Sequence, residues 1–218
     1  MNRGKYFIVL LLISSSLMAQ EIPVLLNGYL VFSGSDKRVN IGTYDLYHVF
    51  KVQECVVYIK QEKKPNYFEC TLFFYDFYGK EISRSDKLSG EFNIKFIDDN
   101  SRILVGQRAH LIRKNESYLF NARGNLINVL SHDYETKEIG ITGDNKYFYF
   151  VSNKMRPLKD GEIPLYPNFA YTAYNHILFF NAGNGLQEKE YSVDGTNLDA
   201  EINGYRYTLE FSVADIPG

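Results

Sequence analysis

Several features that would identify a class of function are missing from this sequence. No basic stripe is present that could neutralise a phosphate backbone, so nucleic acid is not an expected partner. No second long apolar run follows the first 19 residues, so no transmembrane segment is expected in the rest of the chain. Nucleophile elbows, HExxH sequences and phosphate-binding loops are also missing, and the four histidines are scattered. The motifs therefore predict no catalytic residue, no metal ligand and no cofactor.

The first residues of the chain, 1–19, are predicted to be a secretory signal peptide. Arg3 and Lys5 supply a basic start, and residues 6–13 form an apolar run that is too short to span a bilayer. A stretch of small residues follows, and we expect cleavage after Ala19. The alternative is an N-terminal helix or strand that is buried in the fold.

The chain that remains after this cleavage, residues 20–218, has the composition of one ordinary domain. It carries 22 lysines and arginines against 26 aspartates and glutamates, which gives a net charge of −4. Its length is enough to bury a substantial core. We therefore expect a single exported domain that is periplasmic, at the cell surface or extracellular.

Two cysteines, Cys55 and Cys70, lie in the strand-like runs ECVVYIK and YFECTLFFY. A turn-rich segment at residues 62–66 separates the two runs. A hairpin centred near residues 62 and 63 would place the cysteines opposite each other, within the range of a disulfide. Because an exported chain meets an oxidising compartment, we predict a Cys55–Cys70 disulfide. The alternative is a pair of buried free thiols.

The hydrophobic pattern predicts β-strands throughout the chain. Apolar residues alternate or run for four to eight positions, and Gly, Asn, Asp or Pro interrupts them about every ten residues. The pairs Asn27-Gly28 and Asn203-Gly204 stand between strand-like runs and predict two-residue hairpin turns. The unbroken run YFYFV at residues 147–151 predicts a strand that is buried on both faces.

An internal repeat with a spacing of 45 residues covers residues 73–153. The five identical pairs are Gly79 and Gly124, Ile82 and Ile127, Ile94 and Ile139, Asp99 and Asp144, and Asn100 and Asn145. A third, degraded copy begins at ILFFNAGNG, residues 177–185. Each copy predicts two strands around a glycine turn, a polar loop, and two strands around an Asp-Asn turn.

This order of strands and turns resembles the repeat of WD40-like β-propellers over residues 71–153. The resemblance implies four-stranded antiparallel blades that recur about every 40 to 45 residues. The chain departs from that family because it has no Trp-Asp dipeptide, and His132 lacks the glycine that often precedes histidine there. We therefore expect a divergent relative, as a small or incomplete β-propeller-like stack of about 13 to 15 strands. A β-sandwich is the alternative.

One segment, residues 155–176, interrupts the repeat and is the sequence's best candidate for a binding site. It contains three of the six prolines and four aromatic residues, Tyr166, Phe169, Tyr171 and Tyr174. Aromatic rings on a loop can stack on a sugar or insert into a partner protein. Alternatively, they pack onto the sheets as a lid over the core.

Three functions are compatible with these observations. The first is an exported, non-enzymatic module that binds or scaffolds another exported protein or a glycan. The second is a hydrolase or lyase that acts on extracellular polysaccharide, with acids on converging loops. The third is a subunit that assembles with a second copy through open sheet edges.

Overall fold

The computed structural model describes residues 22–32, 34–99, 101–108, 115–132, 136–162 and 171–212. These residues form 17 β-strands, and none of them forms a helix that could cross a membrane. The predicted signal peptide, residues 1–19, lies outside the described residues, as do Tyr166 and Phe169. The prediction of an all-β chain is confirmed, and the pairing between neighbouring strands is antiparallel throughout.

Three four-stranded meanders make up the body of the protein. The first contains β4 (Leu46–Phe50), β5 (Cys55–Lys63), β6 (Phe68–Asp76) and β7 (Glu81–Arg84). The second contains β8 (Leu88–Ile97), β9 (Arg102–Arg108), β10 (Asn115–Asn121) and β11 (Leu126–His132). The third contains β12 (Thr136–Ile141), β13 (Tyr147–Pro157), β14 (Tyr171–Asn181) and β15 (Gln187–Val193). The first two are joined where the beginning of β8 pairs with the beginning of β6.

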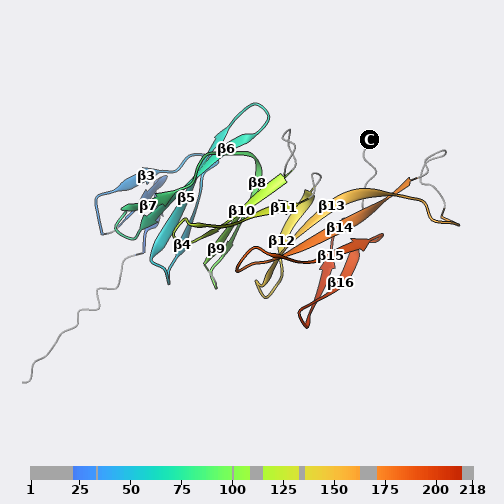
Figure 1. The fold of residues 1–218 in the computed structure, drawn as a ribbon. Coiled ribbons are helices and arrows are strands. Elements are labelled where there is room, and N and C mark those ends of the chain that lie inside the picture. The colour runs from blue at the N-terminus through green and yellow to red at the C-terminus, as the bar shows by residue number, and fades with distance from the viewer. Residues whose placement is uncertain are drawn as a thin grey trace, which may run out of the picture.

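A smaller sheet lies at each end of the row of meanders (Figure 1). The N-terminal sheet contains β1 (Val24–Leu26), β2 (Tyr29–Val31) and β3 (Arg38–Asn40), and the C-terminal hairpin contains β16 (Asn197–Ile202) and β17 (Tyr205–Glu210). The expected propeller-like stack of four-stranded sheets is thus present, and the described sheets do not close into a ring. The described residues contain 17 strands, two more than the upper end of the expected 13 to 15.

The repeat is real in structure but does not coincide with the sheets. The first copy spans β6 to β9, and the second spans β10 to β13, so each copy contributes to two meanders. The sequence shows the order of strands and turns, whereas strand pairing decides which four strands share a sheet. The resemblance to WD40-like repeats implies one blade for each copy, and this assignment is wrong by two strands.

Both faces of the central strands are buried, because each meander is packed between two neighbours. Along β5, Val56 and Tyr58 contact the N-terminal sheet, whereas Val57 and Ile59 contact the second meander. The run at residues 147–151 behaves in the same way, with alternate side chains in two separate apolar clusters. The prediction of burial on both faces is confirmed. Four apolar interfaces therefore hold together the three meanders and the two smaller sheets.

The turn between the third and fourth strand of each meander follows one design. The side-chain oxygens of Asp76, Asn121 and Asn181 each accept hydrogen bonds from two backbone amides of their own turn, at 2.8 to 3.2 Å. Such short side chains mimic a backbone turn and stabilise it locally. The residues that follow them, Phe77, Ala122 and Ala182, are all buried. This turn, a hydrogen-bonding Asp or Asn followed by a buried residue, is the structural basis of the repeat seen in the sequence.

A glycine completes each of these turns and packs against the preceding sheet. Gly79, Gly124 and Gly185 have φ angles of 77°, 85° and 72°. A Cβ atom on Gly124 would lie 2.5 Å from Cδ2 of Phe74, in the meander before it. Gly79 and Gly185 meet the preceding sheet in the same way. The identity of Gly79 with Gly124 is therefore explained by backbone conformation and by close packing.

The two Asn-Gly turns are confirmed as two-residue hairpins. Leu26 pairs with Tyr29 around Asn27-Gly28, and Ile202 pairs with Tyr205 around Asn203-Gly204. In both turns, the asparagine and the glycine have positive φ, between 49° and 81°. This is the conformation that a type I′ turn requires.

The predicted disulfide is wrong, since Cys55 and Cys70 are both free and buried. The turn of the β5–β6 hairpin lies later than expected, because Lys64 N donates to Tyr67 O at 2.8 Å across Pro65. Proline favours this second position of a turn, and Cys55 consequently pairs with Asp76, six positions along the strand from the partner that we expected. That offset separates the two cysteines by about 20 Å. Burial raises the pKa of both thiols, that of Cys70 to about 12, so they stay protonated.

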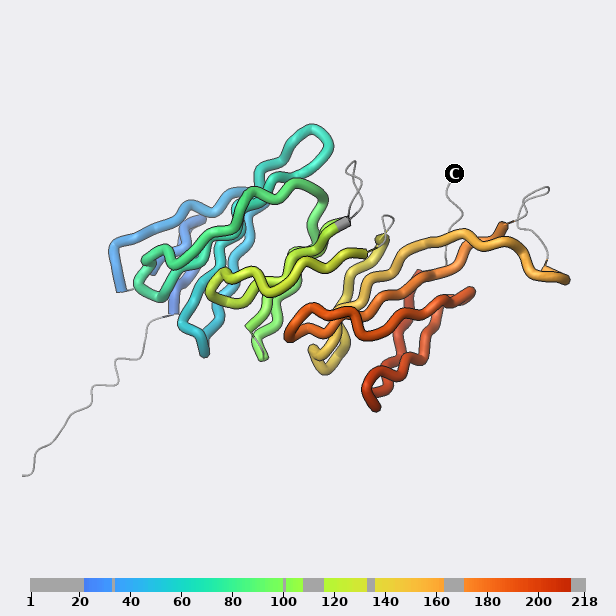
Figure 2. Tube along the Cα trace, in the orientation of Figure 1, coloured from blue at the N-terminus to red at the C-terminus, as the bar shows by residue number. Residues whose placement is uncertain are grey.

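Strand pairing continues into both ends of the segment that interrupts the repeat, at residues 155–157 and 171–176. β13 continues to Pro157 and β14 begins at Tyr171, and these two residues pair with each other. The result is a long hairpin that extends beyond β16 (Figure 2). Pro157 is the last residue of β13, so it leaves the ladder before it intact.

Candidate binding surfaces

The aromatic residues predicted to bind a ligand do not form one described surface. Tyr171 is 49% exposed, whereas Tyr174 is half-buried. Side chains three positions apart on a strand point to opposite faces, so these two tyrosines lie on different sides of β14. Pairing places Tyr171 beside Pro157, and Met155 lies two positions further along the same face. Tyr171 therefore belongs to a small exposed patch with Met155 and Pro157 rather than with Tyr174.

An ion-paired clamp holds the end of this hairpin. Arg156 makes two hydrogen bonds of 2.8 Å to the carboxylate of Glu162 and lies 3.0 Å from Asp194, in the loop between β15 and β16. Hydrogen bonds from Arg156, and one from the Lys159 amide, lower the pKa of Glu162 to about 2. The clamp ties the end of the β13–β14 hairpin to the loop between β15 and β16.

Polar side chains link successive sheets on the side of the molecule where the turns of β4–β5, β8–β9, β12–β13 and β16–β17 lie (Figure 2). His48 and Asp98 are 2.7 Å apart and join the first meander to the second. The Asn145 amide donates to Asp99 at 3.0 Å and joins the second meander to the third. These two turns, which carry the repeated Asp-Asn pair, therefore contribute contacts between sheets.

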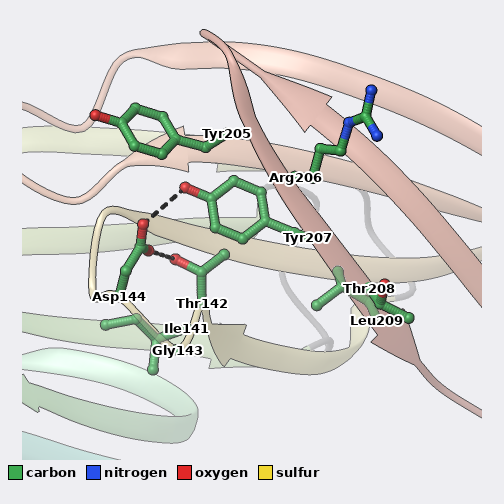
Figure 3. Close-up of a pocket in the computed structure, with 9 residues that line it drawn as sticks. All are labelled: Ile141, Thr142, Gly143, Asp144, Tyr205, Arg206, Tyr207, Thr208 and Leu209. Carbon is green, nitrogen blue, oxygen red and sulfur yellow. Dashed lines mark hydrogen bonds between the residues drawn. The ribbon is translucent and has the colours of Figure 1, made fainter.

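A cavity of about 340 Å³ lies on this side, between the β12–β13 turn and β17 (Figure 3). Its lining includes Asp144, Tyr205 and Tyr207. The Asp144 carboxylate accepts hydrogen bonds from Tyr207 Oη at 2.9 Å and from Thr142 Oγ1 at 2.8 Å. Partial burial opposes ionisation of Asp144, but these hydrogen bonds and the Lys146 ammonium outweigh it and hold its pKa below the ordinary value. The carboxylate thus stays charged and ties the C-terminal hairpin to the third meander.

We expect Asp144→Asn to loosen this hairpin, with a loss of about 1 kcal/mol at neutral pH from weaker hydrogen bonds. Because the pKa of Asp144 is lower in the folded state, its contribution is present above the ordinary aspartate pKa of 3.8 and disappears as the pH falls through the folded value. Urea unfolding at pH 7 and pH 3 should therefore show a difference from wild type that shrinks at pH 3. The exposed Asp160 serves as a control, since Asp160→Asn should match wild type at both pH values. A constant difference at both pH values would contradict the assignment.

The C-terminal hairpin closes one end of the stack with a polar face. Leu198, Ala200 and Ile202 point toward the third meander and are buried. Asp199 and Glu201 alternate with them on β16 and are exposed, as are the outward residues of β17. A charged outer face of this kind is typical of the terminal unit of a repeat protein.

The opposite end of the stack is apolar over β1 and β2. Val24, Leu26 and Tyr29 are 53%, 57% and 43% exposed. Strand register places them on the outward face of the N-terminal sheet, because Leu26 pairs with Tyr29 and Val24 with Val31. Leu30 and Phe32 lie on the inward face and are fully buried. We refer to Val24, Leu26, Tyr29 and Val31 as the N-terminal apolar face.

Sequence reasoning missed this surface, although a signal for it was present. The runs VLL and YLVF on either side of Asn27-Gly28 contain no polar alternation. Such a pattern is typical of strands that have a neighbour on both faces. A strand pair of this kind at one end of the stack has only one neighbour within the described chain, so its second apolar face is left exposed.

No protein-family model matches the sequence, and no curated protein matches it. Solved structures with a similar arrangement include an acylaminoacyl peptidase from Pyrococcus horikoshii, with a TM-score of 0.42 and 11% identity over 68% of this chain and 25% of that one. The β-propeller domain of the Trilobed protease from Pyrococcus furiosus has a TM-score of 0.38 and 12% identity, over 68% of this chain and 42% of that one. Kuenenia stuttgartiensis hydrazine synthase has a TM-score of 0.42 and 10% identity, over 75% and 48%. This chain spans less than half the length of each.

Proposed function

We propose that this protein is an exported, non-enzymatic scaffold that binds another protein through its N-terminal apolar face. The observation that carries the proposal is the contrast between the two ends of the stack. The C-terminal end is charged on its outer face, whereas the N-terminal end exposes Val24, Leu26 and Tyr29 side by side. A contiguous exposed apolar surface is a common feature of protein-binding sites.

The chemistry of this face favours a protein over a glycan. Sugars are recognised by side chains that combine stacking with hydrogen bonds to hydroxyl groups, and three of the four members of the face are aliphatic. The exposed patch around Tyr171 remains the better candidate for a glycan. Export rests on the signal peptide predicted at residues 1–19, and the WD40-like relationship of residues 71–153 rests on their sequence pattern.

The alternative, a polysaccharide hydrolase or lyase, receives less support from the described residues. General acids in such enzymes have a raised pKa. Within the described part of the chain, three carboxyl groups have a shifted pKa, and all three shifts are downward: Glu62, Asp144 and Glu162. In the cavity of Figure 3, the carboxylate of Asp144 is already engaged by its own neighbours.

A photoreactive amino acid at position 26 tests the proposal in the cells that produce the protein. We expect irradiation to give a covalent adduct with another polypeptide chain, identified by mass spectrometry. Position 52 provides the control, because Val52 is 86% exposed but lies alone on the β4–β5 turn. Equal adduct formation at both positions, or none at position 26, would exclude the N-terminal apolar face as a binding surface. In the same preparation, an N-terminus at Gln20 would support export.

A further inference from the structure

We propose that the N-terminal apolar face packs against the same face of a second copy of this chain, giving a dimer with two-fold symmetry. This inference rests on the proposed function, since it names the partner that the face binds. It differs from assembly through open sheet edges, because the contact is made by side chains that project from the sheet.

The first argument comes from the way in which the protein packs its own sheets. Each of its four internal interfaces joins an apolar sheet face to another apolar sheet face. The inward face of the N-terminal sheet follows this rule, with Leu30 and Phe32 packed on Val56 and Tyr58. The outward face has the same chemistry. The neighbour that suits it is therefore another apolar sheet face, at a spacing of about 10 Å.

The second argument is that a second copy carries such a face. Among the described residues, three of the exposed large hydrophobic side chains lie together on this outward face: Val24, Leu26 and Tyr29. Two identical patches of this kind can cover each other about a two-fold axis, as in isologous dimers.

The third argument concerns closure. If the N-terminal face of one copy packed on the C-terminal hairpin of the next, open filaments would form. That contact would bury Asp199 and the Glu201–Arg206 ion pair against aliphatic side chains, and removing charges from water is strongly unfavourable even when they are paired. The polar C-terminal end thus excludes head-to-tail stacking. Assembly through the apolar end stops at two copies.

The charge on the face also fits a two-fold arrangement. Arg38 on β3 pairs with Val31 and shares the outward face. An axis parallel to the strands lays β3 of each copy over β1 of the other, so that the two Arg38 side chains lie at opposite rims. The face consists of three short strands and is smaller than the roughly 800 Å² per partner of a standard interface. We therefore expect a dimer with a dissociation constant in the micromolar range.

Sedimentation velocity of residues 20–218 over about 1 to 500 µM tests this inference, since the range brackets micromolar association. We expect the weight-average mass to rise from that of a monomer toward that of a dimer. Leu26→Asp places a charge on the face beside Val24 and Tyr29 and should weaken association at least about tenfold. The matched control Val52→Asp introduces the same charge at an isolated exposed position and should leave association unchanged. Circular dichroism verifies the fold of each variant, and Val24→Ser serves as a milder variant if Leu26→Asp unfolds.

The outcomes separate this inference from the proposed function. A monomer at all concentrations, together with an adduct between position 26 and a different protein, would exclude the second copy and keep the proposed function. A dimer that Leu26→Asp and Val24→Ser leave intact, or that Val52→Asp weakens equally, would exclude this face as the dimer contact. An adduct of twice the chain mass at position 26 would support both the proposed function and the dimer.

Discussion

Gly124→Ala should destabilise the protein by about 2 to 5 kcal/mol, from two separable causes. Gly124 has a φ of 85°, and an alanine in this left-handed region costs about 1 to 2 kcal/mol. The new methyl group would also lie 2.5 Å from Phe74, whose side chain is fully buried and held between the first and second meanders. Overpacking of this kind adds about 1 to 3 kcal/mol. Chemical denaturation of the purified variant gives the difference in unfolding free energy.

Gly28→Ala is the matched control for this prediction. Gly28 has a similar φ of 78°, but nothing lies within 4 Å of the position that its Cβ would occupy. Its substitution should therefore show the conformational cost alone. If Gly124→Ala and Gly28→Ala destabilise the protein equally, the turn glycine does not act through contact with the preceding sheet, and our account of the repeat is wrong.

Phe150→Ala should destabilise the protein by about 3 to 5 kcal/mol, the usual range for removal of a buried phenylalanine. Phe150 is fully buried between the second and third meanders. Its ring stacks on His132 at 4.6 Å between centroids and meets Phe180 edge-on at 5.2 Å. Its loss would leave a cavity between the second and third meanders. The neighbouring rings could fill this cavity only if the two meanders moved closer together.

Urea unfolding, monitored by circular dichroism, measures this loss. Val52→Ala should change stability by less than about 0.5 kcal/mol, because Val52 is 86% exposed. A loss below about 1 kcal/mol for Phe150→Ala would show that the interface between the second and third meanders contributes little to stability.

The sequence predicted the fold well wherever local chemistry decides the structure. Asn27-Gly28 and Asn203-Gly204 both form the turn that their positive φ preferences favour. The YFYFV run at residues 147–151 is buried on both faces, since its two apolar faces each need a neighbour. All-β structure followed from the same patterns, because period-two apolar alternation has no comparable helical interpretation.

Features that depend on pairing between distant strands could not be predicted in this way. Placing the β5–β6 turn too early shifted the register and produced the wrong disulfide between Cys55 and Cys70. Proline at position 65 was the local signal that could have corrected it. The offset between repeat copies and sheets has a similar origin. A sequence repeat is unchanged when its phase is shifted by two strands, so only pairing reveals the boundaries.

The candidate binding surface was not predictable from side-chain type alone. An exposed Leu26 and a buried Leu30 belong to similar apolar runs, and what separates them is which face has a neighbouring sheet. Tyr171 and Tyr174 looked equivalent in the sequence, but they lie on opposite faces of β14. Functional surfaces on a stack of sheets depend on where the stack ends, and local sequence does not contain that information.

The glycine turn also has a consequence for how such a chain can change in length. From Gly79 to Gly124, the protein advances by 45 residues and one complete sheet, and both ends of that segment make the same kind of contact with the sheet before them. Duplication or deletion of such a segment would join two chain ends that make the same turn and the same contact with the preceding sheet. The stack can therefore lengthen or shorten by whole sheets while each remaining interface keeps its own glycine and its own apolar partners.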